Sequence, residues 1–182
     1  LLRSGALPTP LNIVEERTVG PDLGKDSIEA GVVSLIVGFL LVIIFMLFKY
    51  KLFGFIANIS LISNLLMLLG ILTLLEATLT LPGIAGIILT VGMAVDANVL
   101  IFERIKEELN KENSNIHAFD LGFRRSIITI LDANITTLIA SVILFAFGSG
   151  PVKGFAITLS IGLLTTLFSA YFISRHLTSI VV

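Results

Sequence analysis

Two aspartates stand within long apolar stretches of this sequence, where charged side chains are rare. Asp96 lies in GMAVDANVLIFE, residues 92–103, and Asp132 opens a second copy of the tripeptide Asp-Ala-Asn. An ionised carboxylate at the centre of a membrane-spanning helix costs roughly 2.5–3.5 kcal/mol on insertion scales. Such a group has to be protonated, paired or in contact with water, and a carboxyl group that alternates between these states can carry a proton.

The two aspartates have the same spacing from basic residues. Asp96 lies eight residues before Arg104, and Asp132 lies eight residues after Arg124. With the rise of an α-helix, each aspartate would stand about 12 Å from the same membrane boundary. Two antiparallel helices would therefore bring both acids to one depth.

The asparagines of the two tripeptides, Asn98 and Asn134, are predicted to hydrogen-bond these acids or an ordered water. The competing interpretation is that all four residues only fix helix packing. For Asp132, near the start of its helix, both interpretations stay open. For Asp96, in mid-span, a role in proton transfer is favoured, because asparagine would serve packing without the cost of ionisation.

Two charged residues close the segment that contains Asp96. Glu103 follows Asp96 by seven residues, so the two lie on nearly one helix face. Arg104 is interpreted as a boundary anchor that reaches toward the lipid headgroups, whereas the role of Glu103 stays open. Small and hydroxyl-bearing residues of the second and fifth apolar segments are interpreted as helix-packing residues. They are Asn58, Ser60, Ser63, Asn64, Thr158, Ser160, Thr165, Thr166 and Ser169.

Five apolar segments have to position these residues, and each has about the 20 residues that a helix needs to cross a bilayer. They are residues 28–48, 52–75, 81–102, 127–147 and 154–174. Mean hydropathy is +1.03, and charged residues form 14% of the chain, against about a quarter in typical globular domains. The sequence predicts an all-α membrane protein with a five-helix transmembrane bundle over residues 27–182.

Residues 1–26 are predicted to be the extramembrane end of another domain, followed by a linker. Residues 11–19 are rich in branched side chains, which favours a strand, and residues 26–29 resemble a capping box that opens the first helix. Residues 104–125 are predicted to form a long charged loop. Because the N-terminal segment carries neither a signal peptide nor an initiator Met, we expect a piece of a longer polypeptide.

Charge and residue types exclude several classes of function. A net charge of −1 offers no basic surface for nucleic acid. The absence of cysteine excludes a disulfide and a thiolate metal site, and the two histidines, His117 and His176, form no cluster of metal ligands. No nucleophile–base constellation is present, so we expect neither an enzyme nor a cofactor.

Basic residues predict the orientation, because short loops rich in Lys and Arg stay in the cytoplasm. Alternating the loops across the membrane groups eight basic residues on one side and four on the other. The larger group is Lys49, Lys51, Arg104, Lys106, Lys111, Arg124, Arg125 and Arg175. We therefore expect an N-terminal segment outside the cytoplasm and a cytoplasmic C-terminus.

Residues 92–109, GMAVDANVLIFERIKEEL, resemble the fourth-transmembrane-segment signature of the SecD/SecF family of bacterial protein-export membrane proteins, and of its SecD branch in particular. The matching signature residues are Gly92, Asp96, Glu103 and Arg104. The core of this signature is similar across the resistance–nodulation–division (RND) superfamily. Residues 1–24 resemble the end of the family's first periplasmic domain, and residues 132–162 resemble its fifth and sixth spans.

The resemblance implies an RND/SecD-type bundle in which these helices are the second to sixth of six. It implies a multi-pass inner-membrane protein, with a periplasmic N-terminal segment, that acts with SecF and the SecYEG translocon on an unfolded preprotein, in contact with membrane lipid. Asp96 matches the family's proton-relay carboxylate, and the relay candidates here are Asp96, Asn98, Asp132 and Asn134. The partner charges of that relay lie largely in SecF. Proton and sodium both suit an Asp/Asn site, so the coupling ion stays open.

Three other functions were weighed against protein export. A proton-driven RND efflux transporter shares the signature, but the match here extends through the periplasmic-domain end and the last helices. A passive scaffold would need no titratable Asp96. An intramembrane enzyme is disfavoured because no catalytic constellation is present.

Overall fold

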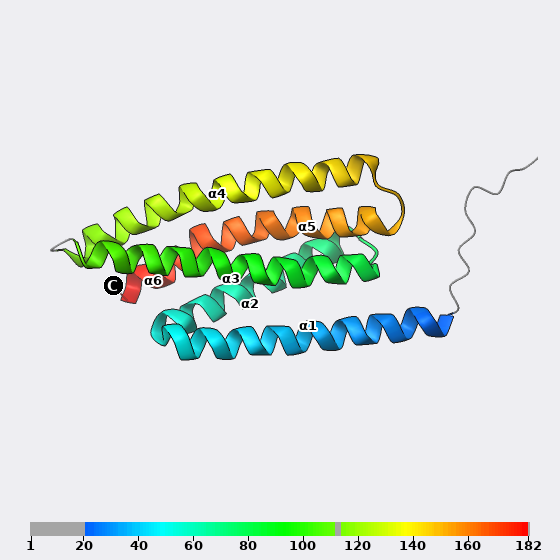
Figure 1. The fold of residues 1–182 in the computed structure, drawn as a ribbon, viewed down its shortest axis with the longest axis horizontal. Coiled ribbons are helices and arrows are strands. Elements are labelled where there is room, and N and C mark those ends of the chain that lie inside the picture. Colours follow the sequence, from blue (N-terminus) through cyan, green and yellow to red (C-terminus); the bar gives the residue numbers. More distant parts are fainter. Residues whose placement is uncertain (1–20, 112–113, 182) are drawn as a thin grey trace, which may run out of the picture.

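The computed structural model describes residues 21–111 and 114–181, and within them the chain is helical almost throughout. The elements are α1 (Pro21–Tyr50), α2 (Leu52–Leu74), α3 (Leu81–Leu109), α4 (Asn115–Phe147), α5 (Pro151–Phe168), the π-helix η1 (Ser169–Ser174) and α6 (Arg175–Val181). The last three follow one another as one rod (Figure 1). The described residues form five helices long and apolar enough to cross a membrane, which confirms the predicted fold class.

Short connections fix the directions of the helices. Lys51, at φ 49°, is the single residue between α1 and α2, and Gly54 packs so tightly at this turn that an added Cβ would overlap the Met46 carbonyl. At the start of α3, the Thr80 hydroxyl accepts a hydrogen bond from the Gly83 amide at 3.2 Å. Capping of this kind satisfies an amide that has no partner inside the helix.

Two boundaries differ from the prediction, and one predicted element lies outside the described residues. Helix α1 begins at Pro21, so residues 26–29 lie inside it and do not cap it; proline is well tolerated in a first helical turn. Residues 104–125 are mostly helical, because α3 runs on to Leu109 and α4 begins at Asn115. The predicted strand at residues 11–19 lies outside the described residues.

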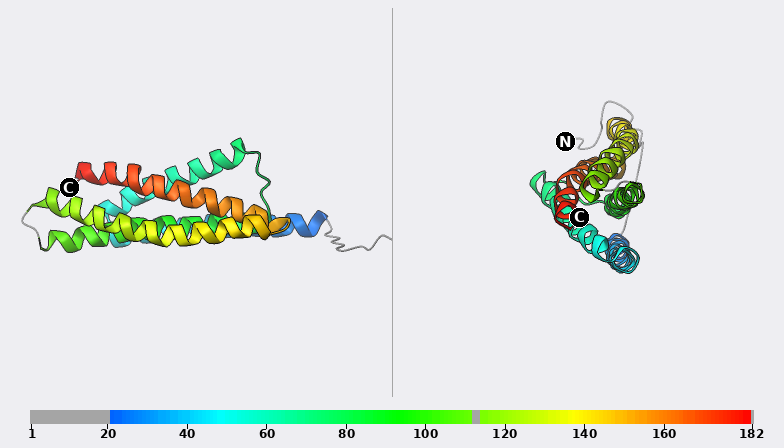
Figure 2. Two further views of the ribbon diagram at one scale, coloured as in Figure 1. Left: turned by 90° about the horizontal axis from the view of Figure 1, so that it is seen from above. Right: turned by 90° about the vertical axis from the view of Figure 1, so that its left-hand side faces the viewer.

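Helix α3 lies between α1 and α4 and packs against both of them and against α5 (Figures 1 and 2). Its contact with α5 is made through small residues: an added Cβ on Gly162 would stand 2.7 Å from the Thr90 Cγ2 atom, and one on Gly86 would stand 3.3 Å from the Thr158 Cβ atom. Small residues of this kind let two helices approach closely where no hydrophobic effect drives them together. Helix α1, by contrast, buries only Met46 among its described side chains.

Hydroxyl and amide groups join α2 to the last rod. Asn64 donates to the Thr166 hydroxyl at 3.1 Å, and the Ser60 and Ser169 hydroxyls lie 2.7 Å apart. Ser169 also donates to the Ser60 carbonyl at 2.8 Å. These four side chains are buried, as the packing interpretation of the sequence predicts.

The close approach of α3 and α5 predicts that Gly162→Ala destabilises the bundle by about 1–3 kcal/mol, the usual cost of overpacking. Thr90 has little freedom to yield, because it is buried and its hydroxyl donates to the Gly86 carbonyl at 2.9 Å. The matched control is Gly70→Ala in α2, where an added Cβ meets nothing within 4 Å. Thermal unfolding in detergent should show a lower midpoint for Gly162→Ala alone; equal midpoints would contradict this account of the interface.

Candidate functional site

Asp96 opens onto a groove of about 280 Å³ between α3 and α4. Each helix contributes four residues at the spacing of a single helical face, which places Asp96 opposite Asn134 and its neighbours. The lining residues are Met93, Asp96, Ala97 and Leu100 from α3, and Ile130, Ala133, Asn134 and Thr137 from α4. The prediction that the two Asp-Ala-Asn segments lie at one depth therefore agrees with the geometry.

The groove forms where α3 and α4 move apart. Figure 1 shows the two helices side by side near the α3–α4 connection and separated by α5 at their other ends. The burial of α4 follows the same course: its buried residues are concentrated between Ala118 and Ile130, and beyond them only Ser141 is buried among the described residues. Asp96 thus lies close to the point of divergence.

The Asp96 side chain is exposed on the surface of the isolated chain, although its helix is apolar on both sides of it. Among the described residues, the Asp96 carboxylate has no ion pair or hydrogen bond. A carboxylate in the middle of a membrane span needs a counter-charge, a proton or water. Whatever satisfies Asp96 must therefore come from outside the described part of this chain.

The other three relay candidates are arranged differently. Asn98 is buried and donates to the Ala94 carbonyl at 2.9 Å, on another face of α3 from Asp96. Asn134 lines the groove, but its amide donates to the Ile130 carbonyl at 2.6 Å. Asp132 is exposed and does not line the groove. The structure thus brings Asp96 and Asn134 together, whereas both asparagine amides bond their own helices and not the aspartates.

The remaining signature residues have separate surroundings. Gly92 borders a second groove, against α1, and an added Cβ there would meet nothing within 4 Å. Glu103 is partly buried and interacts with the Tyr50 hydroxyl. Arg104 is exposed and pairs with Glu107 at 2.8 Å, which is compatible with its interpretation as a boundary anchor.

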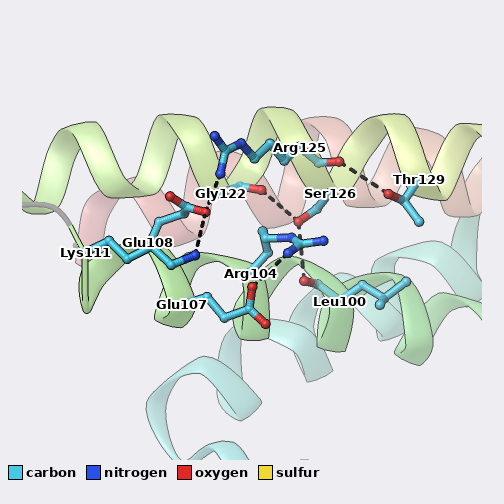
Figure 3. Close-up of polar contacts among 9 residues, drawn as sticks. All are labelled: Leu100, Arg104, Glu107, Glu108, Lys111, Gly122, Arg125, Ser126 and Thr129. Carbon is cyan, nitrogen blue, oxygen red and sulfur yellow. Dashed lines mark hydrogen bonds and ion pairs between the residues drawn. The ribbon is translucent and has the colours of Figure 1, made fainter.

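A buried carboxylate that the sequence analysis did not identify belongs to Glu108. It lies between the groove and the α3–α4 connection (Figure 3). Only 3% of the Glu108 side chain is exposed, and its Oε1 atom lies 2.7 Å from the Arg125 guanidinium and 3.7 Å from the Lys111 ammonium. The same region has a very close backbone contact, because an added Cβ on Gly122 would stand 2.7 Å from the Ile105 Cα atom. We call Ile105, Glu108, Gly122 and Arg125 the hairpin base.

The helical period contains a signal for Glu108. Ala94, Asn98, Ile101 and Ile105 are buried at alternating spacings of four and three residues, and the next step of this series falls on Glu108. The prediction ended the third span at residue 102 because charges begin there. The series of buried positions continues past Glu103 and Arg104, where the charged residues begin. It indicates that α3 stays packed on α4 beyond the apolar segment.

Within the described residues, no group of three His, Asp or Glu side chains is arranged to hold a metal ion. The site instead consists of a single carboxyl group, that of Asp96, which has no partner among the described residues and lies where two packed helices separate. Fold and site together define a polytopic membrane protein whose helices pack through small and hydroxyl residues and whose third span carries an acid in its middle.

Comparison with known proteins agrees with this class. The family model described as "Protein export membrane protein SecD/SecF, C-terminal" matches residues 6–182. The chain is 58% identical to the protein translocase subunit SecD of Magnetococcus marinus, covering 96% of this chain and 33% of the relative. It is 57% identical to SecD of Rickettsia bellii, covering 99% of this chain and 35% of that relative. This chain therefore belongs to the SecD/SecF family and spans about a third of the length of these relatives.

Solved structures agree with the fold. The crystal structure of SecDF from Thermus thermophilus, described as a translocon-associated membrane protein, superposes with a TM-score of 0.87 at 44% identity. The match covers 91% of this chain and 23% of that one. A crystal structure of SecDF in a super-membrane-facing form gives a TM-score of 0.83 at 46% identity, covering 98% of this chain and 24% of that one.

The hairpin base predicts an asymmetry between two charge-removing variants. Arg125→Gln leaves the buried Glu108 carboxylate with only Lys111, so we expect a loss of about 3 kcal/mol of stability, the low end of the cost of removing one partner of a buried ion pair. Glu108→Gln leaves an Arg125 side chain that is 56% exposed and can be solvated, so the loss should be near 1 kcal/mol. Unfolding in detergent should rank the variants in this order, and Lys106→Gln, at an exposed position of α3, is the control. The reverse order would contradict the burial of Glu108.

Proposed function

We propose that this chain is the membrane portion of a protein-export factor of the bacterial inner membrane, in which protonation of Asp96 controls the packing of α3 against its neighbours. The proposal is supported by family membership and, above all, by one observation. The Asp96 carboxylate is at mid-span, opens onto the α3–α4 groove and has no partner among the described residues. An acid that only fixed packing would be expected to face a hydrogen-bond donor of its own bundle.

The neighbourhood of Asp96 suits a site with two packing arrangements. On one side α3 is held closely to α5 by Gly162 and Thr90, and below the groove it is held to α4 by the hairpin base. Between these contacts, the groove leaves space beside Asp96. A change in the charge of Asp96 would alter what can fill that space, while the close contacts keep α3 in place.

The energy available from a proton limits what such a switch can do. One charge moving across 100 mV is worth about 2.3 kcal/mol, and one pH unit adds about 1.4 kcal/mol. The sum of about 3–4 kcal/mol is below the roughly 5.5 kcal/mol needed to move an equilibrium from 1:99 to 99:1. The two arrangements must therefore be nearly balanced before the proton binds.

A partner is needed to complete the site, because Asp96 lies on an exposed face of this chain. We propose that SecF supplies the facing surface and that the complex acts with the SecYEG translocon on an unfolded preprotein. In this proposal the chain is an ion-coupled translocation factor and not an enzyme. The exposed apolar side chains of α1 and α4 would face lipid or partner helices.

The test of the proposal is Asp96→Asn in the full-length protein with its partners. This variant keeps the shape of the side chain and removes its titration, so stimulation of export by the proton gradient should fall to the level seen without the protein. Export of a preprotein into energised inverted membrane vesicles measures this effect, and sodium-energised vesicles distinguish the coupling ion. Glu76→Gln, in the exposed connection before α3, is the control. Normal gradient-dependent export by Asp96→Asn would leave only an anchoring role.

The aspartate of α4 can be tested in the same assay. Asp132 is exposed and does not line the groove, so the proposal gives it no part in the site that contains Asp96. Asp132→Asn should then retain gradient-dependent stimulation within about two-fold, at normal protein levels. Loss of stimulation as complete as that of Asp96→Asn would make Asp132 a second member of the relay.

The proposed orientation has its own test, because the chain contains no cysteine. Single cysteines are introduced at Ser149, between α4 and α5, and at Asn110, at the end of α3. With the C-terminus in the cytoplasm, a membrane-impermeant maleimide added from the periplasmic side should label Ser149→Cys and not Asn110→Cys. The opposite labelling would reverse the topology.

A further inference from the structure

A second pocket lies on another side of α4 from the Asp96 groove, at the end of the bundle where most basic residues gather. It has a volume of about 300 Å³ and lies between α4 and the π-helical end of the last rod. Its lining residues are Asp120, Phe123, Arg124, Ile127, Tyr171 and Arg175. The proposed function does not use any of these residues.

Arg175 is held in place at this pocket by three contacts. Its guanidinium lies 3.3 Å from the Asp120 carboxylate, 5.0 Å from the centre of the Phe123 ring and 5.8 Å from the centre of the Tyr171 ring. Cation–π contacts with two aromatic rings restrict the guanidinium while leaving some of its N–H groups free for further hydrogen bonds. The Arg175 side chain is 41% exposed, so these groups remain accessible.

Arg124 supplies a second positive charge, and its guanidinium is available to bind an anion. Its side chain is exposed and, in the described part of the chain, makes no ion pair or hydrogen bond. The neighbouring arginines differ, because Arg125 is bound to Glu108 and Arg104 to Glu107. Counting Arg124, Arg175 and Asp120, the pocket has one net positive charge.

The position of the pocket along the helices indicates what kind of anion fits. Arg124 stands just before the apolar part of α4, and Arg175 just after the apolar part of the last rod. Both therefore lie at the level where lipid headgroups begin. On the apolar side, Ile128 is 57% exposed and Phe172 is 56% exposed, which provides a surface for acyl chains directly beside the charges.

We propose that this pocket binds the phosphate of an anionic phospholipid, with Arg124 as the principal contact and Arg175 as a fixed second donor. A basic pocket between membrane helices is suited to this ligand, because a phosphate diester accepts several hydrogen bonds while its acyl chains remain in the bilayer. The exposed apolar side chains favour a lipid over a free anion. The proposal requires that the helices span a membrane, and it is independent of proton transfer at Asp96.

The experiment is native mass spectrometry of the full-length protein, purified in detergent and titrated with phosphatidylglycerol. Arg124→Gln should weaken binding about five-fold, the effect of removing one basic contact near an anionic headgroup. Asp120→Asn should strengthen it, because it removes the carboxylate that competes with the phosphate for Arg175, while the Phe123 and Tyr171 rings still hold the guanidinium. Lys49→Gln is the control: Lys49 is an exposed cation at the same end of the bundle, on a different helix. It should leave binding unchanged.

Several results would overturn the proposal. Equal binding by Arg124→Gln and Lys49→Gln would mean that the lipid senses only general charge, or that another part of the protein covers the pocket. Equal binding of phosphatidylcholine would exclude recognition of a net negative headgroup. Displacement of the lipid by millimolar inorganic phosphate would indicate a soluble-anion site. Unfolding midpoints of the variants, measured without lipid, identify losses caused by misfolding, and Asp120→Asn supplies a test in which binding must increase.

Discussion

The structure depends on the close approach of α3 to two different helices at different levels. Gly162 allows α5 to pack closely against α3, and Gly122 allows α4 to pack closely against α3 at the hairpin base. Helices packed this closely cannot slide past one another without a rearrangement of side chains, since protein interiors are close-packed. Helices α3 and α4 must then diverge above the hairpin base, and their divergence creates the groove. The positions of these small residues therefore determine where the groove beside Asp96 forms.

The fold was largely predictable, because hydrophobic length alone identifies membrane-spanning helices. The errors occurred where length and charge give conflicting signals. Residues 104–125 carry many charges and were predicted to be a loop, yet the buried stripe of α3 continues to Glu108. Pairing with Arg125 allows a carboxylate to occupy a core position, and composition cannot register such a partner 17 residues away.

The site was predictable in part. The cost of a charge in hydrocarbon identified Asp96 without any structure, and the equal spacing from Arg104 and Arg124 gave the correct level for the two Asp-Ala-Asn segments. The sequence did not predict which side chains face the bundle. A rotation of about 100° per residue places Asp96 and Asn98 on nearly opposite faces of α3, and the sequence does not say which face is packed. Only the packing of α3 decides that Asn98 is inside and Asp96 outside.

The turn between α1 and α2 has a mechanical consequence. Helix α1 has 30 residues, buries only Met46 among its described side chains and is joined to α2 through Lys51 alone. A tilt of α1 would therefore disturb few buried contacts of its own and would be centred on the Lys51 turn. A force applied at the other end of α1 would act on the first turn of α2, where Gly54 packs closely against the Met46 carbonyl. Such a force would reach α3, the helix that holds Asp96, directly through the contact between α1 and α3, and also through α2, whose hydroxyl and amide groups contact the last rod.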